Sequence, residues 1–401
     1  MPEERILIWG AGRIGRGFVA DLFHAAGYRL TLVDQSEELV AQLTERGKFT
    51  VVSAPNAAER HDRIVGGYRA LSAADSSQVT GALVEADLIA VAVFPQSFPA
   101  VAGQLAPGLV RRMAERPGVT LDIILCANLA HASVQFGALL HTALPEEAQN
   151  YVHRQIGIVE SLVMRMVADP PPEARASDPL LVWTNGFAEF PVDGRALIGP
   201  VPALPSLRLV DDMRAEETRK LYTYNMCHAV LAYQGALRGH RLVTDAMADA
   251  RVLAEAEGAL DEVSRALQAE YGFAEEEMGR WNARVLAQTD NPALRDTVAR
   301  QGADPGRKLK RGDRLVGPAL LAREHGIEPH HLVSGVAAGF LYQNPDDAGA
   351  GRVRARIAEI GIDAAVPELC ELRSEEGEVA EAVVRAYHRL SGELDENAAG
   401  R

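Results

Sequence analysis

The chain has 401 residues, of which 47% are hydrophobic and 24% are charged, a composition typical of a globular protein that is long enough for two domains. Its formal charge of -14 opposes binding to nucleic acid, and the lack of a membrane-length apolar run or of a leader pattern predicts a cytoplasmic protein without a membrane partner. The three cysteines lie far apart and no His-Glu-x-x-His pattern occurs, so we expect neither a disulfide framework nor a metal site.

A glycine-rich turn follows the first predicted strand. Residues 5–9 are apolar, and the sequence Gly-Ala-Gly-Arg-Ile-Gly comes next at residues 10–15, ahead of a helical pattern. Each glycine has a physical role, since Gly10 makes the tight turn, Gly12 lets the backbone approach a pyrophosphate, and Gly15 lets the helix lie close to the strand. The helix N-terminus then offers N–H groups to the pyrophosphate. We therefore predict a dinucleotide-binding site at this turn.

The second predicted strand ends in an acidic residue that bears on the choice of cofactor. Asp34 follows the apolar residues 29–33, at the distance from the glycines where a carboxylate binds the ribose 2′-hydroxyl. A carboxylate there repels a 2′-phosphate, so NAD is favoured over NADP. Arg13 and Ile14 lie within the turn and are expected to contact the cofactor too, although Arg13 or Arg16 could weaken the discrimination between NAD and NADP.

Further apolar strands continue the pattern of a doubly wound parallel sheet. Residues 87–94 form an uninterrupted apolar run, as in strands buried on both faces, residues 119–125 predict another buried strand, and residues 156–160 predict a further strand. Ligands lie beyond the carboxyl ends of such strands, so Asn128 is a candidate contact for the nicotinamide or the substrate. An Asx turn or a helix cap explains Asn128 equally well.

A proline-rich segment at residues 200–205 is the clearest punctuation in the chain and predicts the junction between two domains. Residues 1–205 are predicted to form a Rossmann-like α/β domain that binds the dinucleotide. Residues 206–401 are predicted to form a mainly helical domain that holds the substrate and the catalytic groups.

One predicted helix of the second domain is apolar on nearly all sides and yet carries three functional polar groups. At about 100° per residue, Lys220, Asn225 and His228 fall within one broad arc of the helix at residues 219–235. Any one of them alone is explained as a satisfied polar group in a core. The three together favour a reaction site, because desolvation lowers the pKa of a lysine towards the value that suits a general base.

A dense run of positive charge lies further along the helical domain. Five cationic side chains occur within residues 307–314 of an acidic chain. A solvated loop is the usual explanation of such a run. The alternative, which the pattern favours equally, is a site for a phosphate or a carboxylate with Arg307 and Lys308 as the main contacts.

Together these motifs resemble those of the zinc-independent long-chain polyol dehydrogenases. The likeness rests on the glycine-rich turn, on the spacing KxxxxNxxH that begins at Lys220, on Asn291-Pro292 and on the basic run, and it extends over nearly the whole chain. It implies hydride transfer between a polyol carbon and NAD without a metal. The motifs are like those of members that act on a sugar alcohol phosphate, so the implied reaction interconverts mannitol 1-phosphate and fructose 6-phosphate.

The resemblance also implies roles for the polar residues. Lys220 would be the general base, Asn225 and Asn128 would polarise the developing alkoxide, and His228 would orient the substrate. The family often has an aspartate directly before an arginine at the position where this chain has Met164, and this departure leaves the choice of sugar open.

Three other functions remain open on the sequence. A dehydrogenase of a free polyol would need no phosphate contact, and a hexuronate reductase of the same broad family would bind a carboxylate in its place. A redox sensor that binds NAD without turnover is the third, but it leaves the polar arc unexplained. The sequence is compatible with a monomer or a small homo-oligomer.

Overall fold

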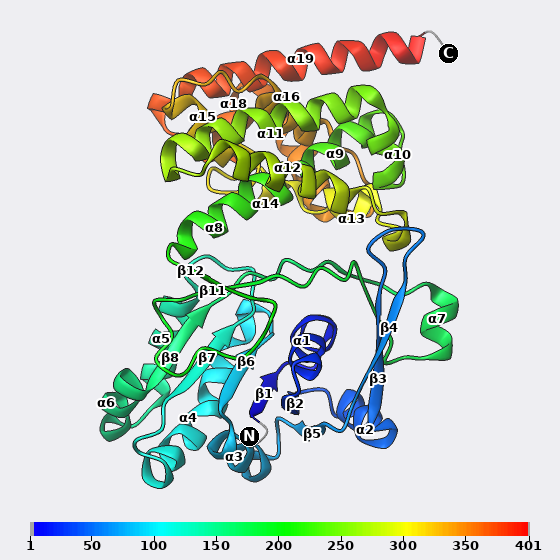
Figure 1. Cartoon of the computed structure of the whole chain (residues 1–401). Helices are drawn as coiled ribbons and strands as arrows, with labels where there is room; N and C mark the ends of the chain where they lie inside the picture. The colour runs from blue at the N-terminus through cyan, green and yellow to red at the C-terminus, as the bar shows by residue number, and fades with distance from the viewer. Residues whose placement is uncertain (1–3, 400–401) are drawn as a thin grey trace. The chain divides into compact units, whose positions relative to one another are not determined.

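The structure, a computed structural model, describes residues 4–399, with the side chains of residues 4–396. The chain forms two compact units, Met1–Glu217 and Thr218–Arg401 (Figure 1). The first unit extends past the proline-rich segment, because the strand that follows that segment pairs with an earlier one: β12 (Leu207–Val210) is parallel to β11 (Phe190–Asp193).

A six-stranded parallel sheet forms the centre of the first unit. Its strands follow the order β5-β2-β1-β6-β7-β8, which confirms the predicted parallel sheet. They are β1 (Arg5–Trp9), β2 (Arg29–Asp34), β5 (Arg69–Ser72), β6 (Leu88–Val91), β7 (Leu121–Leu125) and β8 (Ile156–Glu160). Every residue of β6 and β7 is buried, because these strands carry apolar side chains on both faces, except that β7 contains Asp122, whose carboxylate accepts hydrogen bonds from the N–H groups of Ile198 and Gly199.

Different layers cover the two faces of this sheet. One face packs against helices, namely α3 (Ser76–Glu85), α4 (Phe98–Glu115), α5 (Ala132–Ala143) and α6 (Glu146–Gln155), while η2 (Pro95–Ser97) directly precedes α4. The other face packs against the helix that follows the glycine turn, η1 (Gly15–Ala20) continued as α1 (Asp21–Ala25), and against a smaller sheet. The smaller sheet has the order β4-β3-β10-β9. The remaining elements are α2 (Glu37–Arg46), β3 (Lys48–Ser53), β4 (His61–Gly66), β9 (Val167–Ala168), α7 (Pro172–Ser177) and β10 (Val182–Thr184).

The second unit is built from helices, as predicted. Three consecutive segments, α8 (Met213–Lys220), η3 (Leu221–Asn225) and α9 (Met226–Leu237), run without a break across its start. α9 is the most buried of them and packs against α16, α13 and α11. The other helices are α10 (Val243–Ala248), α11 (Ala250–Tyr271), α12 (Glu275–Thr289), η4 (Pro292–Leu294), α13 (Val298–Gly302), α14 (Pro305–Lys308), α15 (Val316–Glu324), α16 (His330–Leu341), α17 (Ala348–Ile360), α18 (Ile362–Leu369), η5 (Ser374–Glu376) and α19 (Gly377–Ala399). Within residues 4–399, no helix combines the length and the apolar character that crossing a membrane requires.

Candidate active site

The three glycines of the first turn differ in the room around them. Gly10 has a φ of 97°, and a Cβ there would lie 2.4 Å from the carbonyl oxygen of Ala92. A Cβ at Gly15 would lie 1.8 Å from the carbonyl oxygen of Gly10, so the helix approaches the strand only because Gly15 lacks a side chain. A Cβ at Gly12 would meet no atom within 4 Å, so the backbone there faces open space that a pyrophosphate can enter. The turn therefore fits a dinucleotide.

The two arginines of the turn are held by protein groups. The buried Arg16 donates from Nε to the carbonyl oxygen of Ala11 at 2.8 Å and from Nη1 to that of Leu180. Burial lowers the pKa of Arg16 to about 10. Arg13 lies at the surface and forms an ion pair with Asp169 at 3.0 Å. Arg16 thus holds the turn against the rest of the unit. Arg13 would have to break its ion pair with Asp169 to contact the cofactor.

Asp34 ends β2 beside the glycines. Its two carboxylate oxygens accept hydrogen bonds from the backbone N–H groups of Ala11 at 2.7 Å and Ser36 at 2.9 Å. Together with Gly10 and Gly12, Asp34 lines a hollow of about 200 Å³. The carboxylate is therefore fixed in the wall of the hollow that the glycines open, which is the place where it can meet a ribose hydroxyl.

Phe94 lines the same hollow, although it is not among the site residues predicted from the sequence. The apolar run predicts Phe94 as the last residue of a buried strand, whereas β6 ends at Val91 and the Phe94 side chain is 75% exposed. An exposed ring beyond the carboxyl end of a strand is suited to packing against a planar ring of a cofactor. Ile14, by contrast, is partly buried against the core of the unit. The signal for Phe94 is an aromatic residue directly before Pro95, where the strand can no longer continue.

Removing the charge of Asp34 is expected to move the choice of cofactor towards NADP. Asp34→Asn keeps one oxygen, which can accept the N–H of Ala11, but it gives up the hydrogen bond from the N–H of Ser36 and loses the charge that repels a 2′-phosphate. The ratio of kcat/KM with NADP to kcat/KM with NAD should rise about tenfold or more, since like charges brought together cost several kcal/mol. The exposed Glu37 at the start of α2 provides a control, because Glu37→Gln should leave the ratio unchanged. An unchanged ratio in Asp34→Asn would contradict the assignment of this site.

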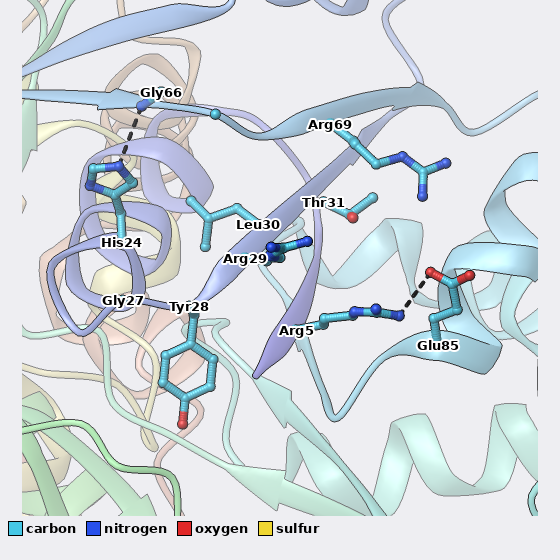
Figure 2. A pocket seen from close by; sticks show the side chains of 11 residues that line it. Arg5, His24, Gly27, Tyr28, Arg29, Leu30, Thr31, Gly66, Arg69 and Glu85 are labelled. Carbon is cyan, nitrogen blue, oxygen red and sulfur yellow. Dashed lines mark hydrogen bonds and ion pairs between the residues drawn. The ribbon is translucent and has the colours of Figure 1, made fainter. Parts of the chain in front are cut away.

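A larger hollow of about 560 Å³ lies at the opposite, amino ends of the strands (Figure 2). Arg5 lies opposite Arg29 in register and Arg69 lies opposite Thr31, so three guanidinium groups start on one face of the sheet. Arg5 pairs with Glu85 at 3.1 Å. Because ligands of parallel α/β sheets bind beyond the carboxyl ends of the strands, this hollow is not the candidate active site.

Asn128 lies exposed in the loop between β7 and α5. This is the carboxyl edge of the sheet, where ligands of open α/β sheets are bound. The N-cap of α5 is His131, so capping of that helix does not account for Asn128. Glu160, at the end of β8, steadies the start of α5 by accepting hydrogen bonds from the N–H of Ser133 at 2.8 Å and from its hydroxyl at 2.9 Å.

In the second unit, the predicted polar helix contains a π-turn between Lys220 and Asn225. The N–H of Met226 donates to the carbonyl oxygen of Leu221, five residues earlier. On a regular α-helix, Lys220 and Asn225 would be about 140° apart around the axis. A turn that contains one more residue brings side chains five positions apart closer to one face, and such turns are frequent at functional sites.

The three polar residues of this segment differ in burial. His228 is 8% exposed, whereas Lys220 and Asn225 are only partly buried, although the sequence predicts burial for all three. The difference follows from α8, whose residues are largely polar and bring Lys220 to the edge of the apolar core. Burial lowers the pKa of His228 to about 4, so its ring is neutral at neutral pH. Its Nε2 lies 3.1 Å from Oγ1 of Thr289, the last residue of α12.

Most cations of the basic run at residues 307–314 have carboxylate partners. Arg307 pairs with Asp313 at 3.0 Å and with Asp304 at 3.4 Å. The other pairs are Lys310 with Glu371, Arg311 with Glu376 and Arg314 with Asp313. Lys308 is buried, donates to the carbonyl oxygen of Gln301 and has no carboxylate within ion-pair distance in the part of the chain that the structure describes. Burial lowers the pKa of Lys308 to about 7. The run is therefore an ion-paired surface segment with one buried lysine.

The position at which the family often has an aspartate lies in the core of the first unit. Met164 is 5% exposed, and the neighbouring Arg165 is buried. Arg165 donates to a carboxylate oxygen of Asp21 at 2.6 Å and to the carbonyl oxygens of Gly17 and Phe187 at 2.7 Å each. Arg165 thus holds the helix that follows the glycine turn.

The three cysteines are free thiols. All three are buried, and burial raises the pKa of Cys126 and of Cys227 to about 12. Across residues 4–396, no three side chains of His, Cys, Asp or Glu gather in a way that could hold a metal ion.

Two family models together match almost the whole chain. The mannitol dehydrogenase Rossmann domain matches residues 4–206, and the mannitol dehydrogenase C-terminal domain matches residues 212–398. Similar solved structures include mannitol 2-dehydrogenase of Pseudomonas fluorescens in a ternary complex with NAD and D-mannitol, at 18% identity and a TM-score of 0.76, with 98% of this chain and 92% of that chain covered. A substrate-free D-sorbitol dehydrogenase is similar at 16% identity and a TM-score of 0.83, with 98% and 94% covered. The two matched domains show that the chain belongs to the mannitol dehydrogenase family.

Proposed function

We propose that this protein is an NAD-dependent dehydrogenase that interconverts a sugar alcohol and the corresponding ketose. The observation that carries the proposal is the segment from Lys220 to His228, in which a π-turn lies between a lysine and an asparagine and a buried neutral histidine follows. A protein that only sensed NAD would have no use for these groups, whose partial or complete burial costs free energy.

Lys220 is the proposed general base of the reaction. It takes the proton from the hydroxyl group of the reacting carbon. The glycine turn and Asp34 would hold NAD, which would supply the acceptor for the hydride of that carbon. Asn225 and Asn128 donate hydrogen bonds to the oxygen as its negative charge grows, and a donor of this kind is commonly worth about 10²–10³ in rate. His228 orients the substrate through a neighbouring hydroxyl group.

We favour an unphosphorylated sugar alcohol as the substrate, because the cations of the basic run that could bind a phosphate are mostly paired with carboxylates. A phosphate dianion approaching a chain of charge -14 needs local cations to overcome the repulsion. Arg307, the leading candidate, already has two carboxylate partners, so its charge is largely neutralised. The two similar solved structures are named as dehydrogenases of mannitol and sorbitol, which supports a hexitol as the substrate.

A sugar alcohol phosphate, the substrate of mannitol-1-phosphate 5-dehydrogenase, is the second candidate because of Lys308. This lysine has a carbonyl partner and no carboxylate partner among the described residues. The charges of Lys308, Arg300 and Arg314 all act to lower the pKa of His228, so positive charge gathers near the residue that would orient the substrate.

A substrate panel tests the proposal. NADH oxidation would be measured with fructose, fructose 6-phosphate, fructuronate and tagaturonate, and NAD reduction with mannitol and sorbitol. We expect turnover of the uncharged hexitols and of fructose, with kcat/KM higher for fructose than for its phosphate. Turnover of the hexuronates alone would replace the proposal by a hexuronate reductase, and binding of NADH without turnover of any of them would support a sensor.

The variants Arg307→Ala and Lys308→Ala separate the two candidates. If the substrate is a free hexitol, each variant should change KM for fructose and for fructose 6-phosphate by similar factors. A rise of about 10–150-fold for the phosphate alone would establish phosphate recognition, since a charge-assisted hydrogen bond is worth about 1.5–3 kcal/mol. Arg354→Ala, at an exposed arginine of α17, is the matched control.

A further inference from the structure

The hydrogen bond between His228 and Thr289 joins two buried side chains. Nε2 of His228 lies 3.1 Å from Oγ1 of Thr289, and the two residues are 8% and 5% exposed. They come from different helices, α9 and α12, which are 61 residues apart along the chain at this contact. The bond therefore ties the orientation of the ring to the packing of the helical unit.

The direction of this bond follows from the second contact of the threonine. The hydroxyl of Thr289 donates its hydrogen to the carbonyl oxygen of Val285 at 2.7 Å. A hydroxyl group has one hydrogen, so towards His228 the oxygen of Thr289 can only accept. Nε2 must then carry the hydrogen of the neutral ring, and Nδ1 must carry the lone pair.

Nδ1 of His228 is therefore a hydrogen-bond acceptor, and within residues 4–396 it has no hydrogen-bond partner. Burial lowers the pKa of His228 to about 4, so the ring is neutral at neutral pH. Among the surrounding charges, that of Asp296 raises the pKa, whereas those of Arg300, Arg314 and Lys308 lower it. A neutral ring in one tautomer presents a single chemical character to a ligand. It can receive a hydrogen but cannot donate one from Nδ1.

The threonine belongs to a row of residues on α12, three of which contact Arg219, Thr223 and His228 of the catalytic segment. Glu277 forms an ion pair with Arg219, next to Lys220. Nε1 of Trp281, one turn further, donates to the hydroxyl of Thr223 at 2.7 Å, and that hydroxyl donates to the carbonyl oxygen of Arg219 at 2.5 Å. The residues of the row are Glu277, Trp281, Val285 and Thr289, spaced four apart and hence on one face of α12.

We propose that Thr289 is a positioning residue that fixes His228 in the Nε2–H tautomer, so that Nδ1 accepts a hydrogen bond from a hydroxyl group of the substrate. This inference rests on the proposed function for the identity of the ligand. It adds a specificity rule: the group that His228 contacts is a hydroxyl donor. A carboxylate or phosphate oxygen offers only lone pairs, so at that position it would face the lone pair of Nδ1 and lose a hydrogen bond.

The test compares Thr289→Val, which keeps the shape of the side chain but removes the hydroxyl, with Thr289→Ser, which keeps the hydroxyl. In protein with ¹⁵N-labelled histidine, His228 should show the Nε2–H tautomer in the native protein and in Thr289→Ser, and a mixed or Nδ1–H pattern in Thr289→Val. The signals of His228 are assigned by their loss in His228→Gln. This readout needs no substrate, so it tests the tautomer even if the proposed reaction is wrong.

Kinetics of the same variants test the consequence for the substrate. With the polyol that the panel identifies, Thr289→Val should lower kcat/KM about tenfold or more while the dissociation constant of NADH is unchanged, and Thr289→Ser should restore most of the activity. The preference for fructose over fructuronate should fall in Thr289→Val, because an Nδ1–H group can donate to a carboxylate.

A control separates positioning from a general loss of packing. Ser334→Ala removes another buried hydrogen bond of α9, in which Nε2 of Gln234 donates to Oγ of Ser334 at 2.9 Å, and it should lower stability without changing the tautomer or kcat/KM. The proposal is overturned if Thr289→Val keeps the Nε2–H tautomer, or if Thr289→Val and Ser334→Ala affect kcat/KM equally. A shifted tautomer with unchanged kinetics would overturn the contact between Nδ1 and the substrate.

Discussion

Replacing Lys220 by alanine is expected to lower kcat for polyol oxidation by about 10²–10⁴-fold, the range that general acid–base catalysis usually contributes. The affinity for NADH should stay the same, because the glycine turn and Asp34 lie in the first unit and Lys220 belongs to the second. The rise of the oxidation rate with pH, which reports deprotonation of the base, should disappear in the variant. Steady-state kinetics over a pH series, together with fluorescence titration of NADH, measure both effects.

Lys48→Ala is the matched control for this loss. Lys48 is an exposed lysine at the start of β3, remote in sequence from the catalytic segment, and its removal should leave kcat unchanged. If Lys220→Ala kept near native turnover, the lysine would be a structural residue of the helix and the proposed mechanism would be wrong. If the turnover fell but the pH profile kept its shape, a different group would be the base.

Replacing Asp21 by asparagine is expected to destabilise the first unit by about 3–5 kcal/mol, because it leaves a buried arginine without its counter-charge. The side chains of Asp21 and Arg165 are 4% and 2% exposed and their charged atoms lie 2.6 Å apart. Arginine cannot escape the cost by losing its proton. At about 2–4 °C per kcal/mol for a unit of this size, the Tm for unfolding of the first unit should fall by about 6–20 °C in calorimetry.

Asp62→Asn provides a control with the same chemical change at the surface. Asp62 pairs with Arg60 at 2.7 Å, but both side chains are about half exposed, so its loss should cost less than about 1 kcal/mol. The double variant Asp21→Asn with Arg165→Met should recover part of the lost stability, since the uncompensated charge is then gone. Equal effects of Asp21→Asn and Asp62→Asn would show that burial does not govern the Asp21–Arg165 pair.

The parts of the fold that the sequence predicts are those that depend on neighbours in the chain. The tight turn at Gly10 and the burial of β6 and β7 follow from backbone conformation and from short apolar runs. The helical nature of the second unit follows from periodicity over single helices. None of these predictions requires knowledge of which distant residues meet.

The details of the candidate site depend on contacts between residues that lie far apart in the sequence. The tautomer of His228 is set by Thr289, and the charge of Arg165 is matched by Asp21, at separations of 61 and 144 residues. The carboxylates that neutralise Arg311 and Lys310 come from residues more than sixty positions later. The π-turn before Asn225 is also invisible to a fixed angle per residue, because the packing around η3 decides where an extra residue is accommodated.

The three glycines of the first turn are required for two different reasons, as the space around each of them indicates. A methyl group at Gly10 or Gly15 would collide with the protein's own backbone, so these two glycines are demanded by folding whether or not a cofactor is present. A methyl group at Gly12 would meet no protein atom within 4 Å, so the fold does not require this glycine, whereas close approach of a pyrophosphate to the backbone does. A chain that keeps the first and third glycines but replaces the second is therefore expected to keep the conformation of this turn, while the new side chain fills the space that the pyrophosphate needs.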